Sequence, residues 1–558
     1  MKKIITLACA LSCIIGASAQ SIYDAAKLAE KDLNGTARFV GMGGAMGALG
    51  GDITTMGTNP AGIGIYRSND VMTSFSFSAY GAESKYDRET FNNDKNRWSF
   101  DNIGFVFSTK VGNETPLRYV NFGFNYKRSK SLYKNMSMAG FMGVYGDRPV
   151  SQANYMAQQA TDAAKYVWDS YREPLDYSNR NIYSDNEAGW LGGIGFQGGM
   201  IEKDSKDENL YHPLNYGEPY SVFNSREQGG VGEYDFNIAF NISDRVYLGV
   251  TVGAYDVNYK KYSGYDESYD NDEGYLLDSY SKIKGSGFDI KLGAIIRPFE
   301  NSSFRVGFAV HTPTFYKLTY ATSARMTTDY KASTGDWDRI IVDTYDYVGD
   351  MERDYRLNTP WTFNVNMGYT VGNSLALGAE YEYEDYSTMK FKYPGNEGGG
   401  DMEFETAEAK NCLKGTHTFR LGAEYKVIPQ FAFRLGYNYT SSAFKDEAVK
   451  YLPSNSIMTD TDFSNKMSQN VFTLGIGYRG SIFYADLAYK FSAYKEDFYP
   501  FFNEFQDAKS GEWALVTPQA TKVTNTRSQV LMTLGFPFYL ETVFNFNNNF
   551  CVLESLEC

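Results

Sequence analysis

The sequence has little proline, cysteine or histidine, and beyond its N-terminal segment it lacks long apolar runs. Its 558 residues include 15 Pro, 5 Cys and 3 His, and no stretch of about 18 apolar residues follows the first twenty. The histidines, His212, His311 and His417, lie far apart, and the cysteines form no C-x-x-C pair. These absences exclude membrane-spanning helices and argue against a zinc site, so we expect neither a metal nor a cofactor.

Positive charge is scarce as well. The chain carries 53 Lys and Arg against 67 Asp and Glu, a formal net charge of −14. Such a chain offers no broad basic surface to phosphates, so we expect no nucleic-acid partner. P-loop, H-E-x-x-H and G-x-S-x-G patterns are absent, and the G-x-G-x-x-G match at 193–198 runs into a solvated polar segment. The sequence therefore predicts that the protein is not an enzyme.

Aromatic residues and glycine are abundant instead. Tyr, Phe and Trp make up 16% of the chain, and there are 53 Gly. Together with the low proline content, this composition favours extended strands with aromatic faces and argues against a helical bundle.

Residues 1–19 have the layout of a secretory signal peptide. Two lysines follow the initiator, an apolar run spans 4–16, and an A-x-A cleavage pattern ends at Ala19. A lipoprotein signal at Cys13 is the alternative, but the residues before that cysteine fit a lipobox poorly. We therefore expect an exported mature chain that begins at Gln20.

Several segments alternate apolar residues with polar or small ones. From Phe431 to Tyr439 every second residue is apolar, and 375–383, 472–478 and 483–491 repeat the pattern. Period-two spacing places the two sets on opposite faces of a β-strand. In a soluble sandwich the apolar face would lie in the core, whereas in a membrane barrel it would face lipid, with aromatic residues near the strand ends forming a girdle.

The lengths of the connections decide between these two folds. We predict fourteen strands, near 69–80, 97–110, 117–128, 231–242, 245–262, 280–297, 302–322, 355–370, 373–392, 413–427, 431–443, 465–479, 481–495 and 521–538. Their connections alternate between short turns, such as 243–244, 371–373, 428–430 and 479–481, and long loops, near 81–96, 129–230, 263–279, 323–354, 393–412, 444–464 and 496–520. Such sorting is typical of a bacterial barrel with tight inner turns and long outer loops.

The predicted fold is therefore an all-β, transmembrane antiparallel barrel of about fourteen strands. It spans 69–538, its longest outer loop is 129–230, and a tail of unknown role, 539–558, follows the last strand. We expect a multi-pass protein in the outer membrane of a Gram-negative-type bacterium. It would be a monomer, surrounded by outer-membrane lipids and assembled by the barrel-insertion machinery.

The faces that we assign to the lumen are strongly charged. They carry Arg305, Glu380, Glu382, Arg420, Glu424, Arg434 and Asp486. One interpretation is a ladder of ion pairs in a wet lumen, and the other is a charged conduction path. We favour the ladder, because charge in a polar lumen requires no special function.

Residues 20–68 do not alternate like strands. They begin with an amphipathic stretch, 22–33, and continue through glycine-rich runs at 41–47 and 50–51. Small side chains allow close backbone packing, and the low charge together with Met and Ile disfavours disorder. We predict that this segment forms a hatch, or plug, inside the barrel.

The N-terminal motifs resemble those of a known family. The matching motifs are Thr36-Ala37-Arg38, Gly41-Met42-Gly43-Gly44-Ala45, Asp52 and Asn59-Pro60-Ala61-Gly62. Placed just after a signal peptide, they are similar to the hatch of FadL/TodX-type outer-membrane transporters. The resemblance implies passive uptake of long-chain fatty acids or other hydrophobic compounds, although some relatives are labelled hemin receptors.

The same resemblance implies a route for the ligand. The ligand would dock at the outer loops and pass to an inner apolar pocket, and movement of the hatch at Asn59, Pro60, Ala61 and Gly62 would open an exit through a kink in the third strand. Gly123 lies in that strand and is a candidate kink point, with an ordinary barrel glycine as the alternative.

The long outer loop adds one more prediction. Within it, 151–172 has helical spacing and predicts a helix that either contacts the ligand or only shields the mouth. Two other functions stay open: a porin-like channel, which the plug disfavours, and a structural or adhesive barrel.

Overall fold

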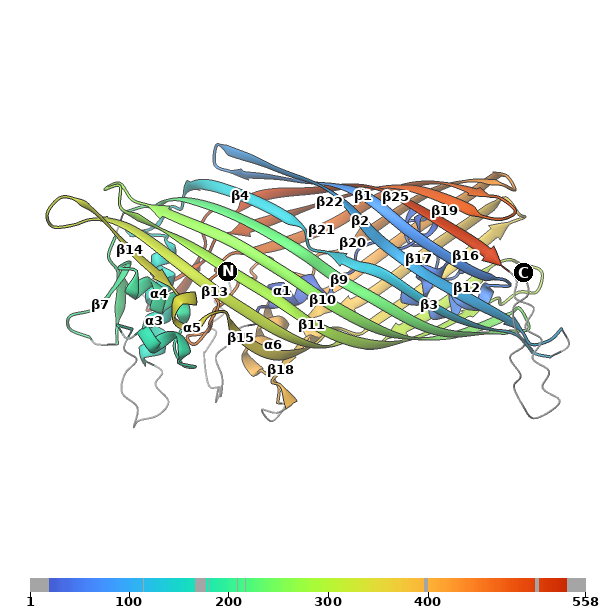
Figure 1. Cartoon of the computed structure of the whole chain (residues 1–558), viewed down its shortest axis with the longest axis horizontal. Helices are drawn as coiled ribbons and strands as arrows, with labels where there is room; N and C mark the ends of the chain where they lie inside the picture. Colours follow the sequence, from blue (N-terminus) through green and yellow to red (C-terminus); the bar gives the residue numbers. More distant parts are fainter. Residues whose placement is uncertain are drawn as a thin grey trace.

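The computed structural model describes residues 20–113, 115–165, 177–178, 180–207, 209–215, 217–395, 400–506 and 511–538. The predicted signal peptide and the tail after Phe538 lie outside these residues. Within the described residues, no helix has the length and apolar character needed to cross a membrane. The molecule is elongated, with tilted strands around short helices (Figure 1).

The wall has fourteen antiparallel positions, some of which hold two consecutive strands. In chain order they are β1 Asn69–Tyr86, β2 Glu89–Lys110, β3 Leu117–Ser131 with β4 Lys134–Phe141, β9 Tyr220–Ile242, β10 Val246–Ser268, β11 Gly274–Ile296, β12 Arg305–His311 with β13 Phe315–Lys331, β15 Met351–Asn358 with β16 Thr362–Val371, β17 Leu375–Asp385 with β18 Lys390–Lys392, β19 Gly415–Ile428, β20 Phe431–Thr440, β21 Phe463–Arg479, β22 Tyr484–Tyr499 and β25 Thr521–Phe538. The last strand pairs with the first, for example Phe536 with Val71, and this pairing closes the barrel.

The remaining elements lie in the N-terminal segment and in the outer loops. The N-terminal segment holds α1 Ile22–Ala29, α2 Ala37–Gly41, η1 Ile53–Gly57 and η2 Pro60–Ile65. The loops hold β5 Val144–Tyr145, β6 Arg148–Pro149, α3 Gln152–Lys165, η3 Arg180–Ser184, α4 Trp190–Gln197, β7 Ile201–Lys203, β8 Tyr211–Pro213, β14 Trp337–Asp343, α5 Tyr345–Val348, η4 Tyr386–Thr388, α6 Glu403–Cys412, β23 Asn503–Gln506 and β24 Trp513–Val516. The helix predicted within 151–172 is α3 as far as Lys165, and its continuation lies outside the described residues.

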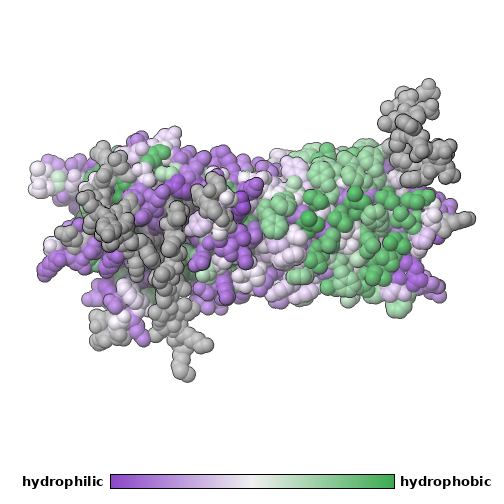
Figure 2. All heavy atoms as spheres, turned by 90° about the horizontal axis from the view of Figure 1, so that it is seen from below, coloured by the Kyte–Doolittle hydropathy of each residue, from purple (hydrophilic) through white to green (hydrophobic). Residues whose placement is uncertain are grey.

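The outer face of the wall is apolar at the end where the turns are short. On β20, Phe433 and Leu435 are 56% and 60% exposed, whereas Arg434 between them is 5% exposed and faces the lumen. The same alternation on other strands produces a broad hydrophobic surface at one end of the molecule, while the opposite end is hydrophilic (Figure 2). An apolar exterior around a polar interior is the mark of a membrane-spanning barrel, so the predicted fold class is confirmed.

Two predicted long loops are wrong. The segment 81–96 belongs to the β1–β2 hairpin, and 263–279 is mostly strand, with only 269–273 between β10 and β11. Outside the membrane the outer face of a strand contacts water instead of lipid, so it need not be apolar, and the alternation that marks the membrane-spanning part fades there.

Three predicted single strands are divided in the structure. One of them, 373–392, is β17 and β18 with η4 between them, and the other two break at a proline. The segment 302–322 breaks at Pro313, between β12 and β13, and 355–370 breaks at Pro360, between β15 and β16. Proline supplies no N–H to a ladder, so each strand is interrupted at that residue.

Candidate functional site

The N-terminal segment crosses the lumen as four short helical elements (Figure 1). Ser21, Thr36, Asp52 and Asn59 cap them, each through a side-chain oxygen that accepts a hydrogen bond from a backbone N–H. These caps satisfy donors at the helix starts. Thr36 Oγ1 also donates to Asp52 Oδ2 at 2.6 Å, so two of the caps brace each other. We call residues 20–68 the hatch.

Glycines on the lumenal face of the wall let the hatch backbone approach closely. Four of them lie in register on successive strands, Gly368 of β16, Gly378 of β17, Gly422 of β19 and Gly436 of β20. We call this row the glycine track, and hatch residues 42–49 run along it. A methyl group added at Gly422 would lie 2.3 Å from the Met42 carbonyl oxygen, closer than any ordinary contact. The sequence carries a signal for this track, glycine at lumen-facing positions of neighbouring strands, which the predictions above do not use.

The motif Asn59-Pro60-Ala61-Gly62 fastens the hatch to another part of the wall. Asn59 Oδ1 accepts a hydrogen bond from the Ala61 N–H at 3.2 Å, and Asn59 Nδ2 donates to Asn366 Oδ1 at 3.1 Å. Pro60 begins η2, where its missing N–H costs nothing. The motif is therefore a capping turn that also binds the wall, and its gating role stays a prediction.

Six of the seven predicted lumenal charges form ion pairs. Arg420 pairs with Glu380 at 2.5 Å and with Glu382 at 2.7 Å, and Arg434 pairs with Glu424 at 2.7 Å and with Asp486 at 2.6 Å. Arg38 of the hatch joins this network by pairing with Glu424 at 3.0 Å. The seventh, Arg305, donates to the Leu49 carbonyl of the hatch at 2.8 Å. These charges tie the hatch to the wall.

Gly123 lies inside β3, paired with both neighbouring strands. A methyl group added there would lie 2.0 Å from Cε of Met56 in the hatch. The register of β3 shifts at 117–119 and at 128–130, not at Gly123. Gly123 therefore makes room for the hatch, and the description of an ordinary barrel glycine fits it better than that of a kink.

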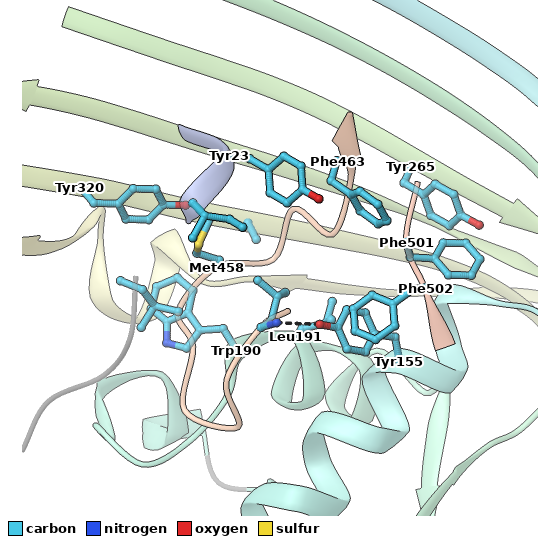
Figure 3. Packing of buried hydrophobic residues seen from close by; sticks show 14 of the residues in the cluster. Tyr23, Tyr155, Trp190, Leu191, Tyr265, Tyr320, Met458, Phe463, Phe501 and Phe502 are labelled. Atoms are coloured by element: carbon cyan, nitrogen blue, oxygen red, sulfur yellow. Dashed lines mark hydrogen bonds between the residues drawn. The ribbon is translucent and has the colours of Figure 1, made fainter. Parts of the chain in front are cut away.

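Outer loops and α1 pack into one apolar cluster in the outer half of the molecule. Tyr155 of α3, Trp190 of α4, Phe502 and Tyr23 of α1 are all buried in it (Figure 3). The Leu452 N–H donates to the Tyr155 hydroxyl at 2.7 Å, which satisfies a polar group that would be costly to bury alone. We call this packing the cap cluster. It leaves the outer mouth filled with side chains.

A cavity of about 170 Å³ lies beside α1 and the hatch residues that follow it. Nine Lys and Arg side chains, six Asp and Glu side chains, and aromatic and aliphatic side chains line it. Most of the charges pair within the lining, for example Lys27 with Glu227 at 3.0 Å. Lys490 is 3% exposed and donates to the Leu33 carbonyl at 2.6 Å, and the described residues supply no ion pair for it.

The wall beside this cavity has a seam without backbone pairing. β2 pairs with β3 only along 102–110, while 89–101 pairs with β1 alone and β4 pairs with β9 alone in the described residues. Side chains bridge the seam instead, as where the Tyr86 hydroxyl donates to the Phe141 carbonyl at 2.7 Å. We call 89–101, together with the facing residues of β3 and β4, the seam.

The seam connects the cavity with a groove on the outside of the wall. Asn93, Asn135 and Met136 line both the cavity and this groove, which measures about 650 Å³. Tyr262 and Tyr280 lie along the groove with ring centroids 4.8 Å apart. The cavity and the outer groove therefore meet at these seam residues, away from the cap cluster.

The closed barrel, its apolar exterior and its filled lumen define the class: an outer-membrane-type β-barrel with an internal hatch. Similar solved structures include a Pseudomonas aeruginosa FadL homologue, at 12% identity and a TM-score of 0.48, covering 94% of this chain and 100% of that one. They also include the Ralstonia pickettii toluene transporter TbuX, at 13% identity and 0.43, and the P. putida toluene transporter TodX, at 11% and 0.45, each covering 91% of this chain and 100% of the other. These structures are of the FadL/TodX type that the N-terminal motifs resemble. No protein-family model and no curated protein matches the sequence.

Proposed function

We propose that the protein is a passive outer-membrane transporter for hydrophobic small molecules, and that long-chain fatty acids are its principal ligand class. The observation that carries the proposal is the cavity beside the hatch, which meets an outer groove at the seam; the ligand would pass between the two there, along this side path. The cavity alone is smaller than the roughly 300–1,000 Å³ of common ligand pockets, but cavity and groove together reach that range. A chain-like ligand would lie partly in each.

The lining of the cavity favours an amphiphile over a pure hydrocarbon. Aromatic and aliphatic side chains such as Phe444, Phe463 and Phe498 would contact an alkyl chain, while the cations outnumber the carboxylates by nine to six. Lys490, which lacks a carboxylate partner, would attract an anionic head group. Lys490→Met should therefore lower oleate uptake several-fold and leave toluene uptake unchanged, and an equal effect on both would contradict this ligand class.

The hatch would control passage from the cavity to the inner side. We place the moving contact at Asn59-Pro60-Ala61-Gly62, because few hydrogen bonds join these residues to the wall: Asn59 Nδ2 donates to Asn366 and Ala294, and Asn237 donates to the Pro60 carbonyl. Ala61 and Ile295 lie in one buried cluster, so Ala61→Cys with Ile295→Cys is the pair chosen to fix this contact by a disulfide. Oxidation should stop fatty-acid uptake and reduction should restore it, with the barrel folded throughout. If the disulfide does not change uptake, the motif acts only as a capping turn and not as a gate.

The side path is tested by closing the seam. Ser137 Oγ donates to Asn93 Oδ1 at 3.5 Å across it, so Asn93→Cys with Ser137→Cys is suited to a short, reducible bifunctional thiol reagent. Crosslinking would close the side path, so the rate of oleate uptake by whole cells should fall at least about tenfold. The matched control is Lys495→Cys with Thr524→Cys, which bridges two strands that are already paired. Unchanged uptake after seam closure, or equal passage of small sugars, would favour a porin-like channel.

A further inference from the structure

Four lysines form a patch on the outside of the wall, directly outward of the apolar surface. They are Lys260 of β10, Lys282 and Lys284 of β11, and Lys317 of β13. Lys260 pairs in register with Lys282, so two ammonium groups stand side by side. We call these four residues the lysine patch. No ion pair involves them in the described part of the chain, although the protein as a whole carries a net charge of −14.

Like charges directly opposite each other on a sheet destabilise it, so this arrangement calls for a counter-charge. The carboxylates near the patch are Asp256, Asp350, Glu352 and Asp354, and Arg356 adds a fifth cation beside Lys317. Asp354 is already engaged, since it accepts a hydrogen bond from Thr319 at 2.6 Å. The close approach of Lys284, and then repulsion from Lys260, lower the pKa of Lys282. The patch therefore keeps a positive surplus.

The height of the patch indicates what supplies the counter-charge. Phe288 and Phe315 pair in register at the outer limit of the apolar surface, with ring centroids 5.3 Å apart. Strands rise about 3.3 Å per residue and tilt by about 40°, so Lys317 lies about 5 Å and Lys284 about 10 Å outward of this aromatic pair. The headgroup layer begins at this level. Lysine side chains also reach along an apolar surface to place their charge in that layer.

We propose that the lysine patch binds the phosphate groups of an outer-leaflet lipid whose headgroup carries more than one phosphate. Spread over about 10 Å of height, the patch matches separate phosphates on one large headgroup better than a single small anion. Its position continues the lipid-facing surface, so the acyl chains of the same lipid would lie against Phe288 and its apolar neighbours. This inference does not depend on which molecule the barrel transports.

The test compares two variants of the full-length protein in a zwitterionic detergent. The patch variant combines Lys260→Gln, Lys282→Gln, Lys284→Gln and Lys317→Gln. The control variant makes the same change in charge at four exposed lysines elsewhere, Lys85→Gln, Lys331→Gln, Lys495→Gln and Lys522→Gln. Heat-modifiable migration on gels first establishes that both variants fold. The probes are synthetic diphosphoryl lipid A, its dephosphorylated form, and inorganic phosphate.

The expected result is at least a tenfold loss of diphosphoryl lipid A affinity in the patch variant and less than a twofold loss in the control. Binding should weaken with salt and with removal of phosphate from the lipid. In thermal unfolding, the lipid should raise the midpoint of the unmodified protein more than that of the patch variant. Retention of affinity within twofold, an equal loss in the control, or equal competition by inorganic phosphate would each overturn the proposal.

Discussion

The glycine track provides the sharpest test of how the hatch is held. In Gly422→Ala the new methyl group would lie 2.3 Å from the Met42 carbonyl oxygen, against an ordinary contact of 3.4 Å, so the hatch would have to retreat by about 1.1 Å. The obstacle is backbone on both sides, because β19 is fixed by its neighbours and residues 42–49 follow the track. Overpacking of this kind costs about 1–3 kcal/mol, and here the cost falls on the hatch rather than on the strand ladder.

Amide hydrogen exchange of residues 42–49 measures this effect directly. We expect faster exchange there in Gly422→Ala, a small shift in the unfolding temperature of the barrel, and greater leakage of small solutes in liposome swelling. The control is Gly264→Ala on β10, where the nearest atom to the new methyl would be Asp278 Oδ1 at 3.2 Å and no hatch residue is close. Unchanged exchange in Gly422→Ala would refute the view that close backbone contact fixes the hatch.

Four other substitutions test the wall, the hatch and the outer loops. Leu435→Arg, on the lipid-facing surface, should destabilise the barrel by about 2–4 kcal/mol in lipid-coupled unfolding, and Tyr439→Arg, nearer the interface, should cost less. Arg38→Met removes the hatch partner of Glu424, which keeps its other arginine, so protease should cut the hatch faster while the barrel stays folded. Burial raises the pKa of Glu408 in α6 to about 8, so its stabilising effect should be complete below about pH 4.5 and disappear as the pH rises through 8. Glu408→Gln should abolish this dependence in hydrogen exchange of α6.

Much of the barrel could be predicted from the sequence because the membrane imposes a simple pattern. Where lipid covers the outer face, as along 431–439, apolar and polar residues must alternate, and the strands were found there. Outside the membrane this constraint vanishes, so the sequence of the outer parts of β10 and β11 predicts a loop where the structure has strands. Pro313 and Pro360 could have been taken as breaks, since neither can donate to a ladder.

The hatch motifs can be recognised in the sequence, but the contacts that they make cannot be predicted from it. The sequence shows Asn59 before Pro60, which indicates a capping turn, yet its bond to Asn366 depends on a register between distant strands. The seam had no sequence signal, because 89–101 has the composition of an ordinary hairpin strand. The cavity likewise arises only when α1, the wall and the outer loops meet, and no single segment encodes it.

The cavity borders the hatch at residues that the sequence motifs did not single out. The hatch contributes Tyr23 to Leu33 to its lining, and Asn59 to Gly62 are not part of it. Segment 30–33 is held there by wall cations: Glu30 pairs with Lys130 at 2.7 Å and with Lys466 at 2.8 Å, Asp32 pairs with Arg527 at 3.0 Å, and Lys490 binds the Leu33 carbonyl at 2.6 Å.

An anionic head group in the cavity would compete with Glu30 and Asp32 for these same cations, whereas a neutral hydrocarbon would not. Differential binding of this kind is what shifts a conformational equilibrium, so a fatty acid would loosen segment 30–33 by occupying its anchors. Any movement at Asn59 to Gly62 would then follow from release of segment 30–33 and not from direct contact with the ligand, because these residues do not line the cavity. The proposed difference between oleate and toluene uptake in Lys490→Met is therefore also a measure of this competition, because only the charged ligand depends on the cation.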